Sequence, residues 1–390
     1  MLIRNIWIAY FLAFCKNAWF WLGVWVFYYL LYTNYAGIGL IETALVVTFI
    51  LTEIPTGAIA DLLGKKNSLM ISFILGTIGS FMMAYAPDFI VLTISVIVLA
   101  IGGTLYSGTL EALIYDSLKQ DKDEEHYPKV ISNISSISLI APALCGLIGG
   151  YLYLISPNLP FILQGVFSAF GLIAVLFLTE PLIDTQVFSW SNYIYQTKQG
   201  FNQLTKNESI LRQTLLLLTI GVILVIADEM LNSFLGVEFE FKPEQLGIFW
   251  AILFLISGIF SQFTSKFLKI VSEKKLLFLT GIIVAVTFIV SPLAGILLGG
   301  ISLTVRAASQ VIFLNTGSFI INKNTESKYR ATTISTYNML RNIPYAVSAY
   351  FIGSLADTYS AKIIASYLGV VLLLLLIFPI LRRPYESSNK

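Results

Sequence analysis

The stretch Gly57-Ala-Ile-Ala-Asp61-Leu-Leu-Gly64-Lys65-Lys66 is a short polar segment between two long apolar runs, residues 37–58 and 68–86. Its glycines permit a tight turn and a close approach of helices, and its aspartate can cap the start of a helix. The adjacent lysines favour the headgroups of a cytoplasmic leaflet. The stretch therefore predicts a loop between two membrane-spanning helices, on the inner side of the membrane.

The composition is that of a membrane protein. Of 390 residues, 57% are hydrophobic and 12% are charged, and the mean hydropathy is +0.81. Charged residues are about half as frequent as in a soluble domain, which excludes an ordinary cytosolic enzyme. A net charge of +2 gives no reason to expect nucleic acid as a partner. Two cysteines and one histidine form no metal-ligand or disulfide pattern, so no metal or cofactor is expected.

Apolar runs recur along the whole chain, and a bilayer-spanning helix needs about 20 such residues. Twelve runs cover residues 6–31, 37–58, 68–86, 89–115, 130–154, 160–179, 213–235, 245–265, 276–291, 293–320, 332–355 and 361–381. Because a spanning segment must satisfy its own backbone hydrogen bonds, helices are expected throughout. The predicted fold is an all-α membrane protein with twelve transmembrane helices.

Lysines and arginines indicate the orientation. With the N-terminus inside, 19 of the 24 fall on the inner side and two on the outer side, in agreement with the positive-inside rule. The first run follows Arg4 without a small-residue cleavage site, which favours a retained span over a signal peptide. We expect a multi-pass protein of the inner cell membrane with both termini cytoplasmic.

The longest polar interval, residues 181–211, divides the chain into two halves. We expect six-helix bundles at residues 1–180 and 212–390, joined by a cytoplasmic loop that is either an amphipathic helix on the membrane or a plain tether. The halves resemble a degenerate repeat, because Gly39-Leu-Ile can be laid on Gly247-Ile-Phe at an offset that places 61–66 over 269–274. This pattern fits a transporter made of two pseudo-symmetric bundles.

The stretch quoted first resembles the signature loop of the major facilitator superfamily, Gly-x-x-x-Asp-x-x-Gly-Arg/Lys-Arg/Lys, and it stands where that family carries it. The resemblance implies the family's fold and a gate latch that favours the outward-facing state. The implied gating residues are Gly57, Asp61, Gly64, Lys65, Lys66 and Asp116, the last an acid near the inner end of span four. The alternative is a charged loop that only fixes topology.

Span five carries a second, partial resemblance, to bacterial twelve-span drug/proton antiporters of the family. Ala141-Pro142 is followed by Gly146 and by Gly149-Gly150, where such antiporters have a glycine-rich stretch with a Gly-Pro step. Small residues and a proline can equally serve ordinary helix packing and a kink. The arginine motif that many such transporters carry in span four is missing from Ser107–Asp116, so the resemblance does not identify the proton-coupling residues.

Ionisable residues inside apolar runs are costly and suggest function. In the resembled family, spans one, four, seven and ten line the central cavity, and each of these spans carries such a residue here. As proton-coupling candidates we take Glu111, Asp228 and Glu229, because a carboxyl in such a site can carry a proton. As substrate-binding candidates we take Lys16, Asn17, Arg306 and Arg341.

Each candidate also has a purely structural interpretation. Arg341 can brace span eleven, and Asp228 and Glu229, which we place in the outer half of span seven, can lie nearer the outer surface. Glu53, beside Ile54-Pro55, can simply bond a neighbouring helix. For Lys16 a mid-span position makes snorkelling difficult, which favours function.

The sequence predicts a secondary active transporter that works by alternating access and is not an enzyme. Export of amphipathic small molecules, coupled to protons, is the main hypothesis. Alternatives are proton symport or facilitated uptake of an anionic metabolite, flipping of a lipid-linked substrate, and, less in keeping with the short loops, a non-transporting receptor. The expected partners are a small-molecule substrate, a proton or other coupling ion and membrane lipids, and the expected assembly is a monomer.

Overall fold

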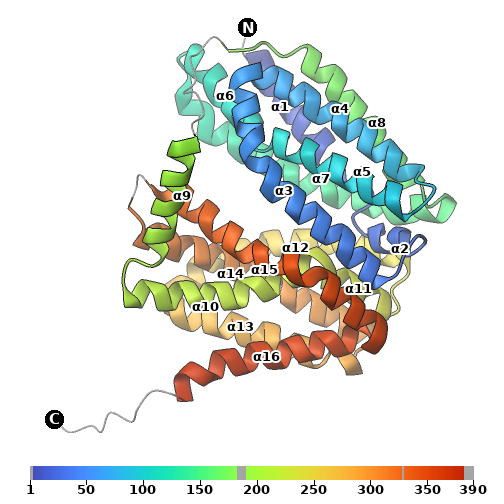
Figure 1. Ribbon diagram of the computed structural model, residues 1–390, viewed down its shortest axis with the longest axis vertical. Helices are drawn as coiled ribbons and strands as arrows, with labels where there is room; N and C mark the ends of the chain where they lie inside the picture. The colour runs from blue at the N-terminus through green and yellow to red at the C-terminus, as the bar shows by residue number, and fades with distance from the viewer. Residues whose placement is uncertain (1–2, 182–189, 327–328, 382–390) are drawn as a thin grey trace. The chain divides into compact units, whose positions relative to one another are not determined.

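All regular secondary structure in the part of the chain that the structure describes is helical. The computed structural model describes residues 3–181, 190–326 and 329–381, and no strand occurs in these ranges. Only the backbone of residues 53–63, which include Glu53, Gly57 and Asp61, belongs to that description. Figure 1 shows the order of the helices along the chain.

The helices of the first half have the following bounds: α1 Ile3–Lys16, α2 Trp25–Tyr29, α3 Tyr35–Leu63, α4 Lys65–Ala84, α5 Phe89–Tyr106, α6 Thr109–Gln120, η1 Glu124–His126, α7 Tyr127–Ile155 and α8 Leu159–Leu176. A linker helix, α9 Trp190–Leu204, follows them. The second half has these: α10 Glu208–Ile226, η2 Ala227–Leu231, α11 Asn232–Glu238, α12 Pro243–Ile270, α13 Glu273–Ile289, η3 Ser291–Leu293, α14 Ile296–Asn324, α15 Arg330–Tyr359 and α16 Ala361–Leu381.

Each of the twelve predicted spans corresponds to one helix or to consecutive helical segments. Among the described residues, eight of them are long and apolar enough to cross a membrane by length and composition. The span formed by α1 and α2 is interrupted, α13 has 17 residues, and α16 contributes a shorter apolar stretch. The predicted all-helical fold is therefore confirmed.

The boundaries differ from prediction at the signature stretch. Helix α3 does not end at residue 58 but continues to Leu63, and Gly64 alone makes the turn into α4. Residues 59–63 contain no helix breaker, whereas Gly64 has φ +87°, a conformation that glycine adopts without steric cost. Asp61 thus belongs to the last turns of α3 and does not occupy the N-cap position of α4.

Contacts divide the chain into two compact units. Unit 1 comprises residues 1–33, 40–190 and 242–254, and unit 2 comprises residues 34–39, 191–241 and 255–390. Both units contain segments from both halves of the sequence, because the first turns of α3 cluster with unit 2 and those of α12 with unit 1.

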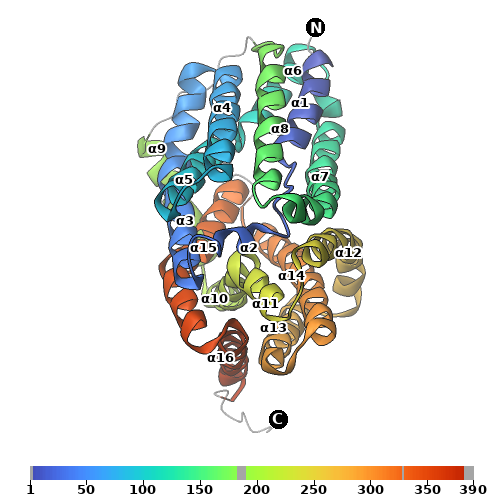
Figure 2. The ribbon, with the colours of Figure 1, turned by 90° about the vertical axis from the view of Figure 1, so that its right-hand side faces the viewer.

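In unit 1, α4 and α8 run side by side, and α1 lies against α7 and α8 (Figure 2). The close approach of α4 to α8 depends on Gly171, because a Cβ there would collide with the ring of Phe73. Ala9, Leu12 and Leu113 are fully withdrawn from solvent in the core beside them. This packing forms a rigid support for the broken span formed by α1 and α2.

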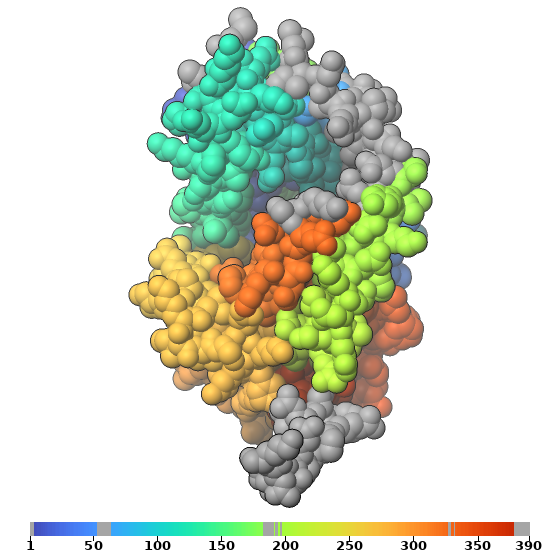
Figure 3. Space-filling model, turned by 90° about the vertical axis from the view of Figure 1, so that its left-hand side faces the viewer, coloured from blue at the N-terminus to red at the C-terminus, as the bar shows by residue number. Residues whose placement is uncertain are grey.

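In unit 2, α13 packs against both α14 and α16. Gly369 allows the approach of α16, because a Cβ there would lie 2.6 Å from the Ala285 carbonyl oxygen. The linker helix α9 packs on α15 at Gly200, where a Cβ would lie 3.0 Å from the Thr332 carbonyl oxygen. Figure 3 shows the green helical segments of α9 and α10 beside the orange start of α15. The segment 190–204 is therefore helical and docked on protein.

The two glycines aligned by the sequence repeat serve the same packing function. A Cβ on Gly39, at the start of α3, would collide with the carbonyl of Ala349 on α15. A Cβ on Gly247, at the start of α12, would lie 2.8 Å from the carbonyl oxygen of Gly146 on α7. Both positions admit a neighbouring backbone that any larger residue would exclude.

Candidate transport and gating site

The first span is broken at its middle, beside Lys16. Helix α1 ends at Lys16 and α2 begins at Trp25, with turns between them. The Asn17 amide ends the helix locally, because its Nδ2 donates to the Ala13 carbonyl oxygen at 2.8 Å and to Ser138 Oγ of α7 at 3.1 Å. The hydropathy pattern predicts one continuous helix over 6–31, and that prediction is wrong. The residues at the break are mostly apolar and aromatic, so hydropathy does not distinguish them from the helix on either side.

Lys16 occupies the C-terminal end of α1, where the helix dipole favours a cation. The side chain is half-buried, and its Nζ lies 5.5 Å from the centre of the Tyr106 ring. No carboxylate among the described side chains lies within 4.0 Å of this ammonium group. Lys16 is thus a cation held by a helix end and an aromatic face rather than by an acid.

The fourth span is also broken, immediately before Glu111. Helix α5 ends at Tyr106, and Gly108 has φ +73° before α6 begins at Thr109. A Cβ on Gly108 would meet open space, so glycine is required there for its backbone conformation alone. Glu111 lies in the first turn of α6 with its side chain exposed, within electrostatic range of Tyr106 and Tyr127. Lys16, Tyr106 and Glu111 therefore belong to one neighbourhood of unit 1.

The seventh span contains a π-helix, and both candidate acids lie in it. The π-helical segment η2 covers Ala227–Leu231, between α10 and α11. The side chains of Asp228 and Glu229 are exposed on unit 2. Asp228 shares a hydrogen bond with Gln310 of α14, and both acids interact electrostatically with Arg341 of α15. Single π-helical turns inside α-helices occur frequently at functional sites.

Arg341 is placed by residues of α10 and α15. It is half-buried, and its guanidinium lies 5.9 Å from the ring centre of Tyr337, whose hydroxyl donates to the Leu217 carbonyl oxygen at 3.2 Å. Gly221 makes room for both side chains, because a Cβ there would lie 2.8 Å from the Tyr337 hydroxyl and 2.9 Å from Arg341 Cδ. The Nε of Arg341 is buried without a hydrogen-bond partner among the described residues. Buried donors without a partner are rare in folded proteins.

Arg306 has a different environment, because it has no exposed surface. Its guanidinium stacks on Phe288 at 3.8 Å and donates to Asn232, Thr287 and Ser302. No carboxylate among the described side chains lies within 4.0 Å of it. Of the four predicted substrate-binding residues, it alone is completely enclosed by protein.

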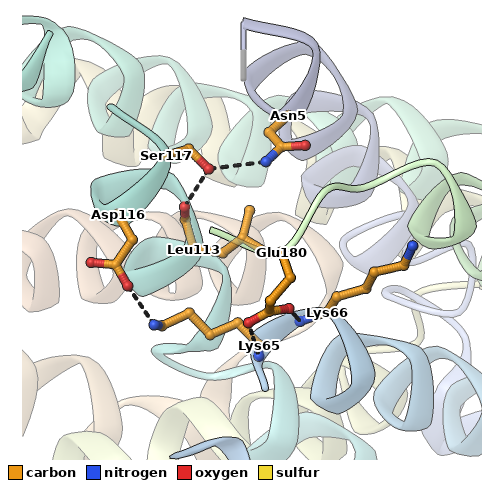
Figure 4. A network of polar contacts seen from close by, with 7 residues as sticks. All are labelled: Asn5, Lys65, Lys66, Leu113, Asp116, Ser117 and Glu180. Carbon is orange, nitrogen blue, oxygen red and sulfur yellow. Dashed lines mark hydrogen bonds and ion pairs between the residues drawn. The ribbon is translucent and has the colours of Figure 1, made fainter. Parts of the chain in front are cut away.

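The gating residues that can be located form a network at one end of unit 1 (Figure 4). Lys65 of α4 forms an ion pair with Asp116 of α6, and both side chains are almost entirely buried, at 11% and 12% exposure. Lys66 lies on the other side, where its Nζ donates to the Leu176 carbonyl oxygen at 2.8 Å. The side chain of Asp61 lies outside the described residues, so the network is built from the other members of the predicted set.

Glu180 completes this network, and sequence reasoning missed it. Its carboxylate accepts the backbone N–H groups of Lys65 at 2.7 Å and of Lys66 at 2.6 Å. Helix α4 begins with two lysines after a glycine that has no side chain for capping, which is unfavourable at the positive end of a helix dipole. This unfavourable N-terminus could have indicated from the sequence that an acidic residue of another segment caps α4. Asn5 fixes the same segment, because its Nδ2 donates to Ser117 Oγ at 3.0 Å and to the Thr179 carbonyl oxygen at 2.8 Å.

Other residues were missed because their position depends on helix rotation. Gln310, Gly221 and Asn232 arrange the groups around η2 and Arg306. Glu42 is a buried acid in α3, at 5% exposure, within electrostatic range of Tyr29. Its position within a predicted span could have identified it as a further intramembrane acid.

Comparisons with known proteins agree with this architecture. The family model described as Major Facilitator Superfamily matches residues 6–349. Searching curated protein sequences gives no match. Among solved structures, the nucleoside transporter NupG is similar with a TM-score of 0.79 and 17% identity, covering 99% of both chains.

Two further solved structures have similar folds. A POT family transporter in complex with 5-aminolevulinic acid has a TM-score of 0.74 and 12% identity, over 97% of this chain and 95% of that one. A bacterial homologue of the human lysosomal transporter Spinster, in an inward-facing and unoccupied conformation, has a TM-score of 0.69 and 14% identity, over 97% and 94%. At these identities the similarity establishes the fold alone.

Proposed function

Because the chain belongs to the Major Facilitator Superfamily, we propose that it is a proton-coupled secondary transporter that exports amphipathic small molecules. Transport by alternating access follows from the family and the fold. The coupling ion, the direction and the substrate class are our proposal. The observation that carries it is the placement of Glu111, Asp228 and Glu229 at backbone irregularities of spans four and seven.

Carboxylates in these positions suit proton coupling. Glu111 follows the break at Gly108, and Asp228 and Glu229 lie in the π-helix. None of them forms an ion pair within 4.0 Å among the described side chains. A carboxylate without a fixed cation can be neutralised by a proton when its surroundings become apolar during the transport cycle.

The network around Lys65 and Asp116 is proposed as the inner gate latch. The pair joins α4 to α6, and Glu180 joins the start of α4 to the segment that follows α8. We propose that the protein lies in the inner cell membrane, with this end of unit 1 and both chain termini in the cytoplasm. We also propose that it works as a monomer. Two buried charges held in this way favour one arrangement of the latch over partly open ones.

Aromatic residues near the break in span one support an amphipathic substrate. Trp19 and Trp21 stack with ring centres 5.4 Å apart, and Trp25 meets Tyr29 at 5.3 Å. In span five, a Cβ on Gly150 would lie 2.5 Å from Glu244 Cα, so this glycine serves close helix packing whether or not the protein is an antiporter. Arg306 does not contact substrate in this proposal, because it is fully enclosed.

A second candidate function is proton-coupled uptake of an anionic or polar metabolite. The observation that favours it is Lys16, a half-buried cation without an acidic partner among the described side chains. Nucleoside and peptide transporters are among the proteins of similar fold, so polar cargo is a reasonable substrate class to include.

Purified protein in proteoliposomes with an imposed pH gradient tests both functions. The panel comprises cationic and anionic amphipathic dyes, nucleosides and short peptides. We expect Glu111→Gln to abolish accumulation driven by the gradient while substrate exchange without a gradient persists, and Glu124→Gln, an exposed acid of η1, to behave as wild type. Unchanged gradient-driven transport in Glu111→Gln would refute the role of Glu111, and net flux in the direction of the protons would favour the second function.

A further inference from the structure

Among the described side chains, Arg306 is the largest that is completely buried, and no described acid neutralises its charge. Burying a guanidinium without a counter-ion is unfavourable unless its donors find good acceptors. Here they do, and the face of the group lies on the Phe288 ring at 3.8 Å. An arrangement with this desolvation cost is expected to hold neighbouring elements in a fixed position.

The acceptors belong to three elements of unit 2. Arg306 Nε donates to Thr287 Oγ1 at 3.3 Å, and Nη2 donates to the Thr287 carbonyl oxygen and to Ser302 Oγ, both at 3.3 Å. Helices α13 and α14 are also joined directly, because Ser302 Oγ donates to the Thr287 carbonyl oxygen at 2.9 Å. The hydrogen bond from Arg306 Nη1 to Asn232 Oδ1 links α14 to α11, and the direct bond between α13 and α14 does not replace it.

Asn232 is the first residue after the π-helix η2. On the facing helix α14, Arg306 binds Asn232, and Gln310, one turn further along, binds Asp228. The two contacts are four residues apart on both elements, so α14 holds η2 at its beginning and at its end. A π-helical turn that relaxed to α-helix would rotate neighbouring side chains by about 100°.

We infer that Arg306 is a positioning residue, which keeps η2 in its π-helical register through Asn232 and thereby directs Asp228 and Glu229 toward Gln310 and Arg341. The inference rests on the proposed function in one respect: it assumes that these carboxylates take part in coupling. The register itself is a property of the fold and can be measured without transport.

The test compares Asn232→Ala with Thr287→Val in the full-length protein. Both variants remove one acceptor from Arg306, but only Asn232 belongs to the η2 and α11 segment. In purified protein, we expect amide hydrogen exchange in residues 224–234 to become about tenfold faster in Asn232→Ala and to remain unchanged in Thr287→Val. Asn232→Asp, which keeps the acceptor oxygen, should restore slow exchange.

Transport gives the second measurement. Asn232→Ala should displace the pH profile of gradient-driven transport, whereas Thr287→Val should lose thermal stability and keep the wild-type profile. Equal exchange rates and equal pH profiles in the two variants would show that Arg306 is only structural. If Asp228→Asn leaves gradient-driven transport intact, the proposed role of Asp228 in coupling is refuted, whereas the exchange result still decides the positioning role of Arg306.

Discussion

Lys65 of α4 and Asp116 of α6 form an ion pair whose side chains retain only 11% and 12% of their exposure. Removing one partner leaves the other charge buried and unpaired, which costs several kcal/mol, about 3–5 in typical cases. We therefore expect Lys65→Ala and Asp116→Ala each to reduce transport and thermal stability strongly. The exchange variant Lys65→Asp with Asp116→Lys should recover part of both.

The control is the exposed pair of Arg212 and Glu208, whose side chains are 74% and 78% exposed. Exposed pairs of this kind contribute little to stability, so Arg212→Ala should retain wild-type transport and melting temperature. Transport and melting temperature are measured in Lys65→Ala, Asp116→Ala, the exchange variant and Arg212→Ala. Failure of the exchange variant to exceed either single variant would contradict a pairwise role for the two charges.

Glu180 is expected to stabilise α4 through charge as well as through hydrogen bonding. Its two oxygens accept the N–H groups of Lys65 and Lys66 at the positive end of the helix dipole. Glu180→Gln keeps one acceptor and loses the charge, which should lower the free energy of unfolding by about 1–2 kcal/mol. Thermal unfolding in detergent at low and high salt measures the effect, which salt should diminish.

The same chemical change at an exposed cap provides the control for Glu180. Asp88 Oδ1 accepts the Val91 N–H at 2.9 Å at the start of α5, in an exposed position. Because asparagine is as good an N-cap as aspartate, Asp88→Asn should change stability by a few tenths of a kcal/mol, about the range seen among good caps. Equal losses in both variants would mean that burial beside the lysines adds nothing.

Gly108 separates α5 from α6 and sets the direction of Glu111. Gly108→Ala creates no collision, since the space around its Cβ is open, but it places alanine at φ +73°. A left-handed conformation costs a non-glycine residue about 1–2 kcal/mol, so stability should fall by about that amount. Transport should also fall, because relief of the strain turns α6 relative to α5 and changes the direction of Glu111.

Gly258 is the matched control for this substitution. It lies within α12, has no atom within 4 Å of an added Cβ and has no positive φ. Gly258→Ala should be neutral or stabilising by about 0.5–1 kcal/mol, because alanine favours a helix. A loss of stability in Gly258→Ala equal to that in Gly108→Ala would contradict the conformational explanation.

The contrast between Gly108 and η2 shows what the sequence could provide. Hydropathy predicts the helical spans, because a helix satisfies all the backbone hydrogen bonds of a spanning segment within that segment. The prediction of one span over 89–115 missed the break at Gly108, although a glycine followed by Thr109 and Glu111 could have indicated it. A π-helical turn has no such compositional sign. The break after Lys16 lies among apolar residues, so hydropathy does not detect it.

The candidate residues show the same limit. Arg306 and Arg341 are alike in the sequence, as arginines in the middle of spans ten and eleven. The direction in which a helix turns its side chains makes Arg306 fully enclosed and leaves Arg341 half-buried with a free Nε. That rotation depends on close contacts such as the one at Gly221, which are set by the packed fold rather than by local spacing.

Asp357 of α15 is expected to hold the first turn of α3. Its carboxylate accepts the Tyr35 N–H at 3.0 Å and the Ala36 N–H at 2.8 Å, and the Tyr35 ring packs on Phe234 with centres 4.1 Å apart. Removing this carboxylate should weaken the attachment of the first turn of α3 to α15 by about 1 kcal/mol. That change corresponds to roughly fivefold more frequent release of the turn. Reaction of an Ala36→Cys variant with a membrane-impermeant maleimide measures that release, because the native cysteines, Cys15 and Cys145, are buried.

We expect Asp357→Ala to accelerate labelling at position 36 by about this factor, which is the magnitude of one helix-terminus charge interaction. Asp88→Ala, which removes a carboxylate that caps only its own helix, should leave the labelling rate unchanged. The first turn of α3 clusters with unit 2 while the rest of α3 belongs to unit 1, and we expect release of this turn from α15 to accompany the transport cycle. Labelling that is equally slow with and without the Asp357 carboxylate would show that glycine packing, at Gly39 and Gly353, holds the turn by itself.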